Sequence, residues 1–117
     1  MVLFRKMGME AMNMREAEFK SFLINSVDIE SKVKAVTSRV AKALYVEREL
    51  KVNLDSVVKN DKEMYQLLLR IQDELNDKQY HNVHQNAVRK YYLFVNEKEF
   101  PRIKQYERTR TNRIEVI

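Results

Sequence analysis

The amino-acid sequence predicts an all-α protein, because its composition and its apolar periodicity both favour helices. The 117 residues include only one glycine and one proline, which leaves little material for the tight turns of β-sheets. Apolar residues recur at three- and four-residue spacing in several segments, as they do on one face of an amphipathic helix. We expect a compact four-helix orthogonal bundle over residues 15–100, with an N-terminal arm at 1–14 and a basic tail or linker at 101–117.

The first helix is predicted over residues 15–26. Phe19, Phe22 and Leu23 share one face of this segment at helical spacing. Glu16 lies in the first turn, where the positive end of the helix dipole favours an acidic side chain. The segment is therefore expected to bury one apolar face against the rest of the bundle.

The second helix is predicted to run from Ser31, which can cap it, to about Leu50. Lys32, Arg39 and Lys42 fall within roughly a quarter-turn of one another, given the step of about 100° per residue in an α-helix. Such a basic stripe can lie along a phosphate backbone. The buried face expected for this helix consists of Val33, Val36, Val40, Ala43 and Leu44.

A connector with a short turn of helix is predicted at residues 53–58, and its Leu54 and Val57 are expected in the core. Asp61 begins the third helix, where an acidic side chain is favourable. The polar run 76–78 ends this helix. Its apolar face consists of Met64, Leu67, Leu68, Ile71 and Leu75.

The fourth helix is predicted over residues 80–96, and it has two different faces. Its apolar face consists of Ala87, Val88, Tyr91, Tyr92 and Val95. Its other side carries groups that are capable of contacting phosphates or base edges, namely His81, Asn82, His84, Gln85, Arg89 and Lys90. Pro101 marks the boundary after this helix, and the tail from Arg102 to Arg113 is expected to be extended or mobile.

Positive charge is concentrated in two segments of the chain. The net charge is +5, but residues 31–60 carry seven Lys and Arg against three acids, and residues 81–117 carry eight against four. The segments 1–30 and 61–80 are each slightly acidic. A basic surface attracts phosphate more effectively than dispersed charge, so this distribution favours a polyanionic partner.

Several kinds of chemistry are disfavoured by the sequence. The chain has no cysteine, which excludes disulfides and thiolate zinc sites and favours the reducing cytoplasm. His81 and His84 have only Asp77 as a nearby acid, so a metal site there is not expected. No glycine-rich phosphate loop or nucleophile elbow is present, so we expect neither a cofactor nor an enzyme. The N-terminal segment is too interrupted for a signal peptide or a membrane span.

Two short motifs and the order of the helices resemble a known family. Leu-Asp-Ser-Val-Val at residues 54–58 precedes the third helix, and Asn-Ala-Val-Arg-Lys-Tyr-Tyr-Leu-Phe-Val at 86–95 lies in the fourth. Together they resemble the SAM-like core-binding domain of tyrosine recombinases and phage integrases, over roughly residues 15–100. The resemblance implies a DNA-binding module without the catalytic domain that a recombinase needs, either as a fragment of a recombinase or as a stand-alone binder.

In that family the starts of the second and fourth helices approach the groove of the DNA. The resemblance therefore implies contacts from Ser31, Lys32 and Lys34, and from His81, Asn82, His84, Gln85 and Arg89. We expect double-stranded DNA to be held mainly by phosphate contacts from Lys32, Lys34, Arg39, Lys42, Arg89 and Lys90, with groove contacts from His81, Asn82, His84 and Gln85.

Three alternatives remain open at this stage. The basic residues can simply form a solvated helix face, as Lys and Arg usually do. The protein can be a helical interaction or regulatory module of a phage or mobile element, with a protein partner bound by the Met-rich arm or by the tail. It can also bind single strands or RNA, which requires solvent-facing aromatic residues beside the basic stripe.

Overall fold

Helices form most of the chain that the computed structural model describes, residues 14–26 and 32–116, with side chains over 14–26 and 33–110. The elements in this part are α2 (Glu16–Ile24), α3 (Lys32–Leu50), α4 (Leu54–Val57), α5 (Asp61–Glu74), the 3-10 helix η1 (Asp77–Tyr80), α6 (Val83–Asn96) and α7 (Ile103–Val116). No strand occurs in these ranges, and the predicted all-α class is confirmed.

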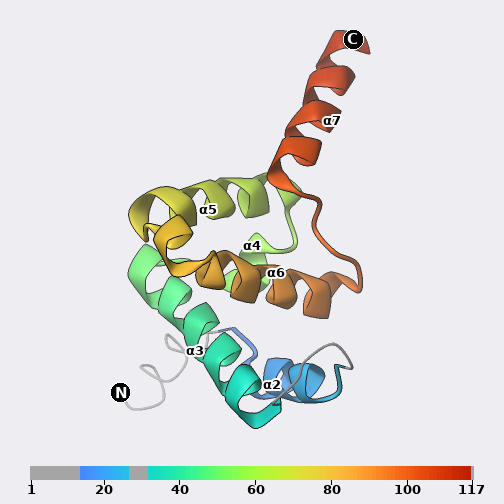
Figure 1. The fold of residues 1–117 in the computed structure, drawn as a ribbon. Helices are drawn as coiled ribbons and strands as arrows, with labels where there is room; N and C mark the ends of the chain where they lie inside the picture. Colours follow the sequence, from blue (N-terminus) through green and yellow to red (C-terminus); the bar gives the residue numbers. More distant parts are fainter. Residues whose placement is uncertain (1–13, 27–31, 117) are drawn as a thin grey trace, which may run out of the picture.

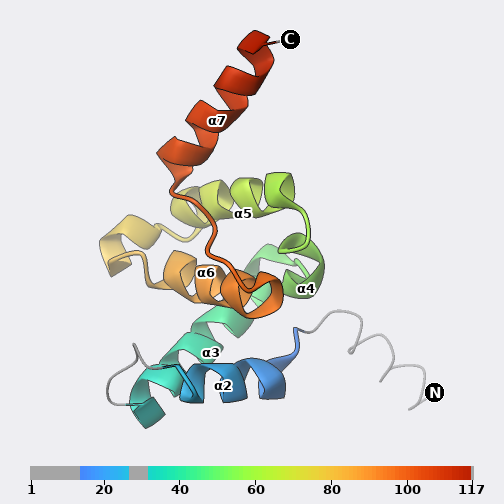
Figure 2. The same ribbon diagram turned by 90° about the vertical axis from the view of Figure 1, so that its right-hand side faces the viewer.

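Helix α6 is the central element of the fold. It packs against α2, α3, α4 and α5, and most extensively against α3. Helix α2 lies beside α3 on one side of α6, and α5 lies on the other side (Figure 1). Figure 2 shows the same order from α2 through α3 and α6 to α5. Helix α7 projects away from this body beyond α5 in both views.

The core is built around two tyrosines of α6. Tyr91 and Tyr92 are almost completely buried. Phe19 of α2 meets Tyr91 edge to face with 5.0 Å between ring centroids, and Phe100 meets Tyr92 in the same way at 5.1 Å. This geometry places the positive ring edge against the negative ring face and is favourable. It fixes both α2 and the segment that follows α6 onto the central helix.

The predicted apolar faces are confirmed with one clear exception. Leu54 and Val57 of α4 are buried, as expected. Val33, which was expected in the buried face of α3, is 84% exposed, because it lies in the first turn and the packed face begins one turn later at Val36. The other predicted face residues are buried (Phe19, Leu23, Val36, Val40, Ala43, Met64, Leu67, Leu68, Ile71, Ala87, Val88, Tyr91 and Tyr92) or half-buried (Phe22, Leu44, Leu75 and Val95).

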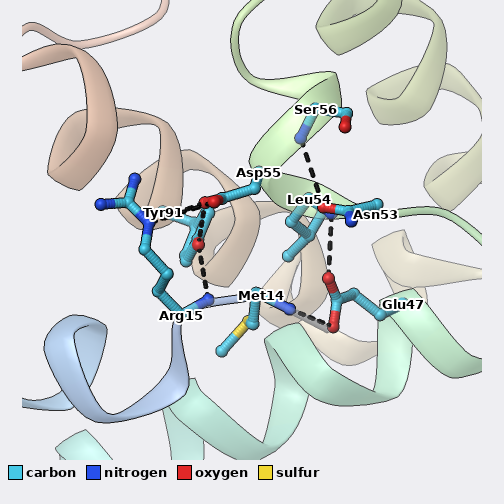
Figure 3. Close-up of polar contacts among 8 residues, drawn as sticks. All are labelled: Met14, Arg15, Glu47, Asn53, Leu54, Asp55, Ser56 and Tyr91. Carbon is cyan, nitrogen blue, oxygen red and sulfur yellow. Dashed lines mark hydrogen bonds and ion pairs between the residues drawn. The ribbon is translucent and has the colours of Figure 1, made fainter. Parts of the chain in front are cut away.

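A buried carboxylate joins the start of the described chain to the start of α4 (Figure 3). Glu47 of α3 is 6% exposed, and its two oxygens accept hydrogen bonds from the backbone N–H groups of Met14, at 3.1 Å, and Leu54, at 2.9 Å. Burial raises the pKa of the Glu47 carboxyl above its usual value, and the two backbone hydrogen bonds oppose that shift. Glu47 therefore satisfies two backbone donors that are distant in the sequence.

A second polar cluster lies beside it and reaches α6 (Figure 3). The Tyr91 hydroxyl accepts a hydrogen bond from the backbone N–H of Arg15, at 2.9 Å, and donates one to Asp55. The Nε of Arg15 lies 3.1 Å from both oxygens of Asp55. Burial, followed by the hydrogen bond to Asp55, raises the pKa of the Tyr91 hydroxyl. The cluster ties the segment before α2 to both α4 and α6.

The tail after Pro101 forms α7, so the prediction of an extended or mobile segment from Arg102 to Arg113 is wrong. The Tyr106 ring packs on two rings of the body, with centroids 4.9 Å from Tyr65 and 5.3 Å from Phe100. The many Lys, Arg, Glu and Gln residues of this segment are good helix formers. Packing of the first turns onto the body then holds the helix in place.

Several helix ends require backbone geometry that glycine would adopt more easily. Lys51, Asn76, His81, Asn82 and Glu97 have φ angles between 52° and 61°, which is the left-handed region. A side chain with a Cβ atom in this region clashes with the backbone and costs roughly 1–2 kcal/mol. With one glycine in the whole sequence, the chain ends its helices mainly with other residue types.

We expect Glu97→Gly to raise the free energy of unfolding by about 0.5–1 kcal/mol, because Gly adopts this conformation without the Cβ clash. Glu97 is exposed and follows α6 with φ at 61°. Urea denaturation followed by circular dichroism measures the change. Glu97→Ala is the matched control, since it keeps the Cβ atom and should bring no gain. A Gly variant that is less stable than the Ala variant would contradict the expectation.

The burial of Glu47 predicts a specific pH dependence. Its pKa in the folded state is raised, so the folded state holds the proton more tightly than the unfolded state does, and stability falls as pH rises through the folded-state pKa. Glu47→Gln cannot titrate. Wild type should therefore lose stability relative to this variant as pH rises above about 4, the ordinary pKa of a glutamate. Urea denaturation at several pH values tests this, and a constant difference above that pH would count against it.

Candidate nucleic-acid interface

A groove runs along the contact between α3 and α6, and we call it the α3–α6 groove. It consists of two adjoining hollows that share Arg39 and Asn86. One is also lined by Ala35, Ser38, Lys42 and Val83, and the other by Arg89, Lys90, Leu93, Glu99 and Phe100. Four of the predicted cations, Arg39, Lys42, Arg89 and Lys90, thus come together here. The two basic segments of the sequence contribute to one surface.

Arg39 is a half-buried cation at the centre of this groove. Its Nη1 atom is buried, and it has no hydrogen-bond partner in the described part of the chain. A buried donor without an acceptor costs about 1–3 kcal/mol, and more when the group is charged. An anion bound in the groove would add negative charge beside this guanidinium and offset part of the cost of its burial.

Arg89 is the second half-buried cation of the groove. Its Nη1 donates hydrogen bonds to the backbone carbonyls of Phe100, at 2.9 Å, and Pro101, at 3.1 Å. Burial lowers the pKa of the guanidinium, the positive charge of Arg102 lowers it further, and Glu99 acts in the opposite direction. The guanidinium stays charged, because arginine side chains keep their proton in proteins. Arg89 and Arg102 together carry two positive charges against the one negative charge of Glu99, so the net local charge is positive and favours an added anion.

The start of α6 differs from the prediction. The helix begins at Val83, and the predicted start at Tyr80 falls at the end of η1. Asp77 is fully buried, and its carboxylate accepts hydrogen bonds from the backbone N–H groups of His84, at 3.0 Å, and Gln85, at 2.9 Å. Asp77 therefore caps α6, because it satisfies N–H groups of the first turn that have no partner inside the helix.

His84 and Gln85 are structural residues here. They are 8% and 4% exposed, so the prediction that they lie on the open side of the helix is wrong. The Nδ1 atom of His84 lies 2.8 Å from Asp77, and the side-chain amide of Gln85 bonds to Asn82 and Gln72. Since their polar groups already have partners inside the protein, we leave both out of the proposed interface.

The remaining predicted contacts lie elsewhere. His81 and Asn82 are exposed in the left-handed turn between η1 and α6, and neither lines the groove. Lys34 is exposed on α3 and is likewise absent from the groove lining. Ser31 lies outside the described residues, and so does the side chain of Lys32.

The sequence interpretation missed two polar residues of the groove. Asn86 lines both hollows, and Ser38 lines one of them. Asn86 lies three and four residues before Arg89 and Lys90, so helical periodicity places it on their side of α6. Ser38 immediately precedes Arg39 and carries no signal of this kind.

We expect Asp77→Asn to lower the free energy of unfolding by about 2 kcal/mol, because an amide has one acceptor where the carboxylate has two. Asp73→Asn is the matched control: Asp73 is exposed on α5, and its replacement should change stability by less than about 0.5 kcal/mol. Urea denaturation of both variants measures the difference. Equal losses of stability would argue against the capping role of Asp77.

The described side chains contain no group of three or more His, Cys, Asp or Glu residues placed to hold a metal ion. None of the helices in the described ranges combines the length and the apolar character that crossing a membrane requires.

Comparisons with family models, with curated proteins and with solved structures found no match to this chain. The resemblance to recombinase core-binding domains therefore rests on the two sequence motifs and on the order of the helices.

Proposed function

We propose that this protein binds double-stranded DNA and that phosphate groups of one strand lie in the α3–α6 groove. The observation that carries the proposal is the convergence of four cations from two helices on one hollowed surface: Arg39, Lys42, Arg89 and Lys90. A solvated helix face, which was the simplest alternative, would not require cations from different helices to gather in this way or to be half-buried.

The burial of the two arginines supports an anionic ligand in particular. Arg39 has a buried N–H donor without a partner in the described chain, and burial lowers the pKa of Arg89. Both features cost free energy in the unliganded protein. A phosphate in the groove would add negative charge near both guanidinium groups, so binding would lower the cost of burying each of them.

The spacing of the cations is compatible with a DNA backbone. Arg39 and Lys42 are three residues apart on α3, which is about 4.5 Å along the helix axis at about 1.5 Å per residue. Phosphates of one strand of a duplex follow one another at about 3.4 Å along the DNA axis. Neighbouring cations can therefore contact neighbouring phosphates, and non-specific binding with a Kd on the order of 10⁻⁴ to 10⁻⁶ M is expected.

The family resemblance supports the same proposal, with a changed contact set. Residues 86–95 carry the second motif, and they include Asn86, Arg89 and Lys90 of the groove. The family comparison implied contacts at the start of the fourth helix, whereas the groove favours contacts about one turn further along α6. DNA integration and recombination stay implied by the resemblance alone, and the groove supports only the binding step.

The alternative of a protein-interaction module has less support. The apolar tail residues Ile103 and Tyr106 are half-buried and pack against the core, so they are engaged within the protein. Of the Met-rich arm at residues 1–14, only Met14 is among the described residues, and it is buried in the core. The α3–α6 groove, by contrast, is lined by four cations, and this favours an anionic ligand.

Fluorescence anisotropy with a labelled random-sequence duplex, at low and at moderate salt, tests the proposal. We expect Arg39→Ala combined with Lys42→Ala to weaken binding at least about 10-fold at low salt and to reduce the slope of log Kd against log salt by about 2. Each lost phosphate contact removes about one released counterion, which gives this change in slope.

The matched control is Lys62→Ala, which removes one positive charge from an exposed position of α5 outside the groove. It should change Kd by less than about threefold, because the charge lies outside the contact surface. A second variant, Lys42→Ala with Lys90→Ala, leaves the half-buried arginines in place if loss of Arg39 loosens the fold. Groove variants that bind as well as Lys62→Ala would overturn the proposal.

A further inference from the structure

An aromatic cluster lies at the end of the α3–α6 groove near the start of α6. Tyr45 of α3 and Tyr80 of η1 both pack on the ring of His84, with centroid distances of 5.2 and 6.4 Å. Tyr45 is 36% exposed and Tyr80 is 54% exposed, whereas the ring of His84 beneath them is buried. Both tyrosine rings therefore lie against the buried His84 ring and are exposed to solvent.

These exposed rings differ from the two tyrosines of α6. Tyr91 and Tyr92 are almost completely buried, and they hold the core together. Among the described residues, Tyr80 makes one ring contact, to His84, and that contact is edge to face with an angle of 87° between the rings. More than half of the Tyr80 surface is exposed, so its ring is accessible to a ligand.

The cluster continues the line of cations in the groove. Lys42 lines the hollow next to it and lies three residues before Tyr45 on the same helix. Val83 lines the same hollow and lies three residues after Tyr80. On the far side of Tyr45, the guanidinium of Arg48 lies over the ring at 5.4 Å from its centroid. A nucleic-acid strand that leaves the groove at this end would meet aromatic rings with cations on both sides.

A base inside a duplex is already stacked on its neighbours, so an exposed aromatic ring has no access to its face. An unpaired base has a free face, and such bases commonly stack on Tyr, Phe or Trp beside a basic groove. Exposed rings next to phosphate-binding cations are therefore the combination expected for single-stranded nucleic acid. The groove alone fits a duplex backbone equally well.

We propose that Tyr80, supported by His84 and Tyr45, is a stacking platform for an unpaired base of the DNA whose backbone lies in the α3–α6 groove. The preferred ligand is then DNA in which a duplex continues into a single strand. This inference rests on the proposed DNA binding and specifies the kind of DNA that is bound. Stacking accepts any base, so the preference concerns strandedness and not sequence.

The test compares three DNA probes at one salt concentration: a blunt duplex, the same duplex with a single-stranded overhang, and the overhang strand alone. We expect wild type to bind the overhang duplex about 10-fold more tightly than the blunt duplex, which corresponds to one stacked base. Tyr80→Ala should abolish this preference and leave the affinity for the blunt duplex unchanged. Tyr80→Phe keeps the ring and should keep the preference.

A fluorescent base analogue, 2-aminopurine, placed in the overhang reports stacking directly. Wild type and Tyr80→Phe should quench its fluorescence, and Tyr80→Ala should not. Tyr80→Leu keeps an apolar contact to His84 without a flat ring, so it separates stacking from any loss of local structure. Quenching that persists in both Tyr80→Ala and Tyr80→Leu would overturn the platform.

The outcomes separate this inference from the function on which it rests. Equal affinity of wild type for blunt and overhang duplexes overturns the platform and leaves duplex binding intact. Absence of binding to all three probes at low salt overturns both. Tight, Tyr80-dependent binding to the single strand alone, without binding to the blunt duplex, supports the platform and overturns the assignment of double-stranded DNA.

Discussion

Buried carboxylates at the junctions between helices are the interaction on which this fold depends. The first N–H groups of a helix have no partner within that helix, so each helix start needs acceptors from elsewhere in the chain. Glu47 accepts from the chain before α2 and from the first residue of α4, and Asp77 accepts from the first turn of α6. Two acidic side chains thereby fix three segments of the fold.

The position of the groove follows from the way α6 is held. Asp77 sets where α6 begins, and Tyr91 and Tyr92 set which side of it faces the core. The helical period then directs Asn86 and Lys90 away from the core and toward the edge shared with α3. The same constraint presses His84 inward, where its ring supports Tyr45 and Tyr80. Groove and aromatic cluster are therefore two consequences of one helix placement.

The sequence was sufficient to predict the elements with strong apolar periodicity. The buried face of α5 and the apolar face of α6 were both predicted from side-chain spacing, because burial of such a face dominates the energetics of an amphipathic helix. The cations of the groove, including Arg39 and Arg89, were also named from the sequence. Their proximity depends on the packing of α3 against α6, which charge counts along the chain do not report.

The errors arise where a polar residue has a structural role. His84 and Gln85 belong to types that are usually exposed, and their burial depends on an acid that a 3-10 turn brings back to the helix start. That turn uses the left-handed conformation at His81 and Asn82, which side-chain periodicity does not reveal.

The prediction for the tail after Pro101 is wrong for a related reason. Its polar residues predicted an extended or mobile segment, and Tyr106 instead anchors a helix by packing on Tyr65.

The half-buried arginines connect the stability of this protein with its proposed binding. The positions of Arg39 and Arg89 are unfavourable for a positive charge. Arg39 has a buried N–H donor without a partner in the described chain, and burial together with the charge of Arg102 lowers the pKa of Arg89. Apolar side chains of similar volume would often be more stable at such positions. Neither residue has a carboxylate as hydrogen-bond partner in the described chain. An anion bound in the α3–α6 groove would account for the free-energy cost of burying these two cations. Cations that are partly removed from water bind a phosphate more strongly than fully solvated ones do.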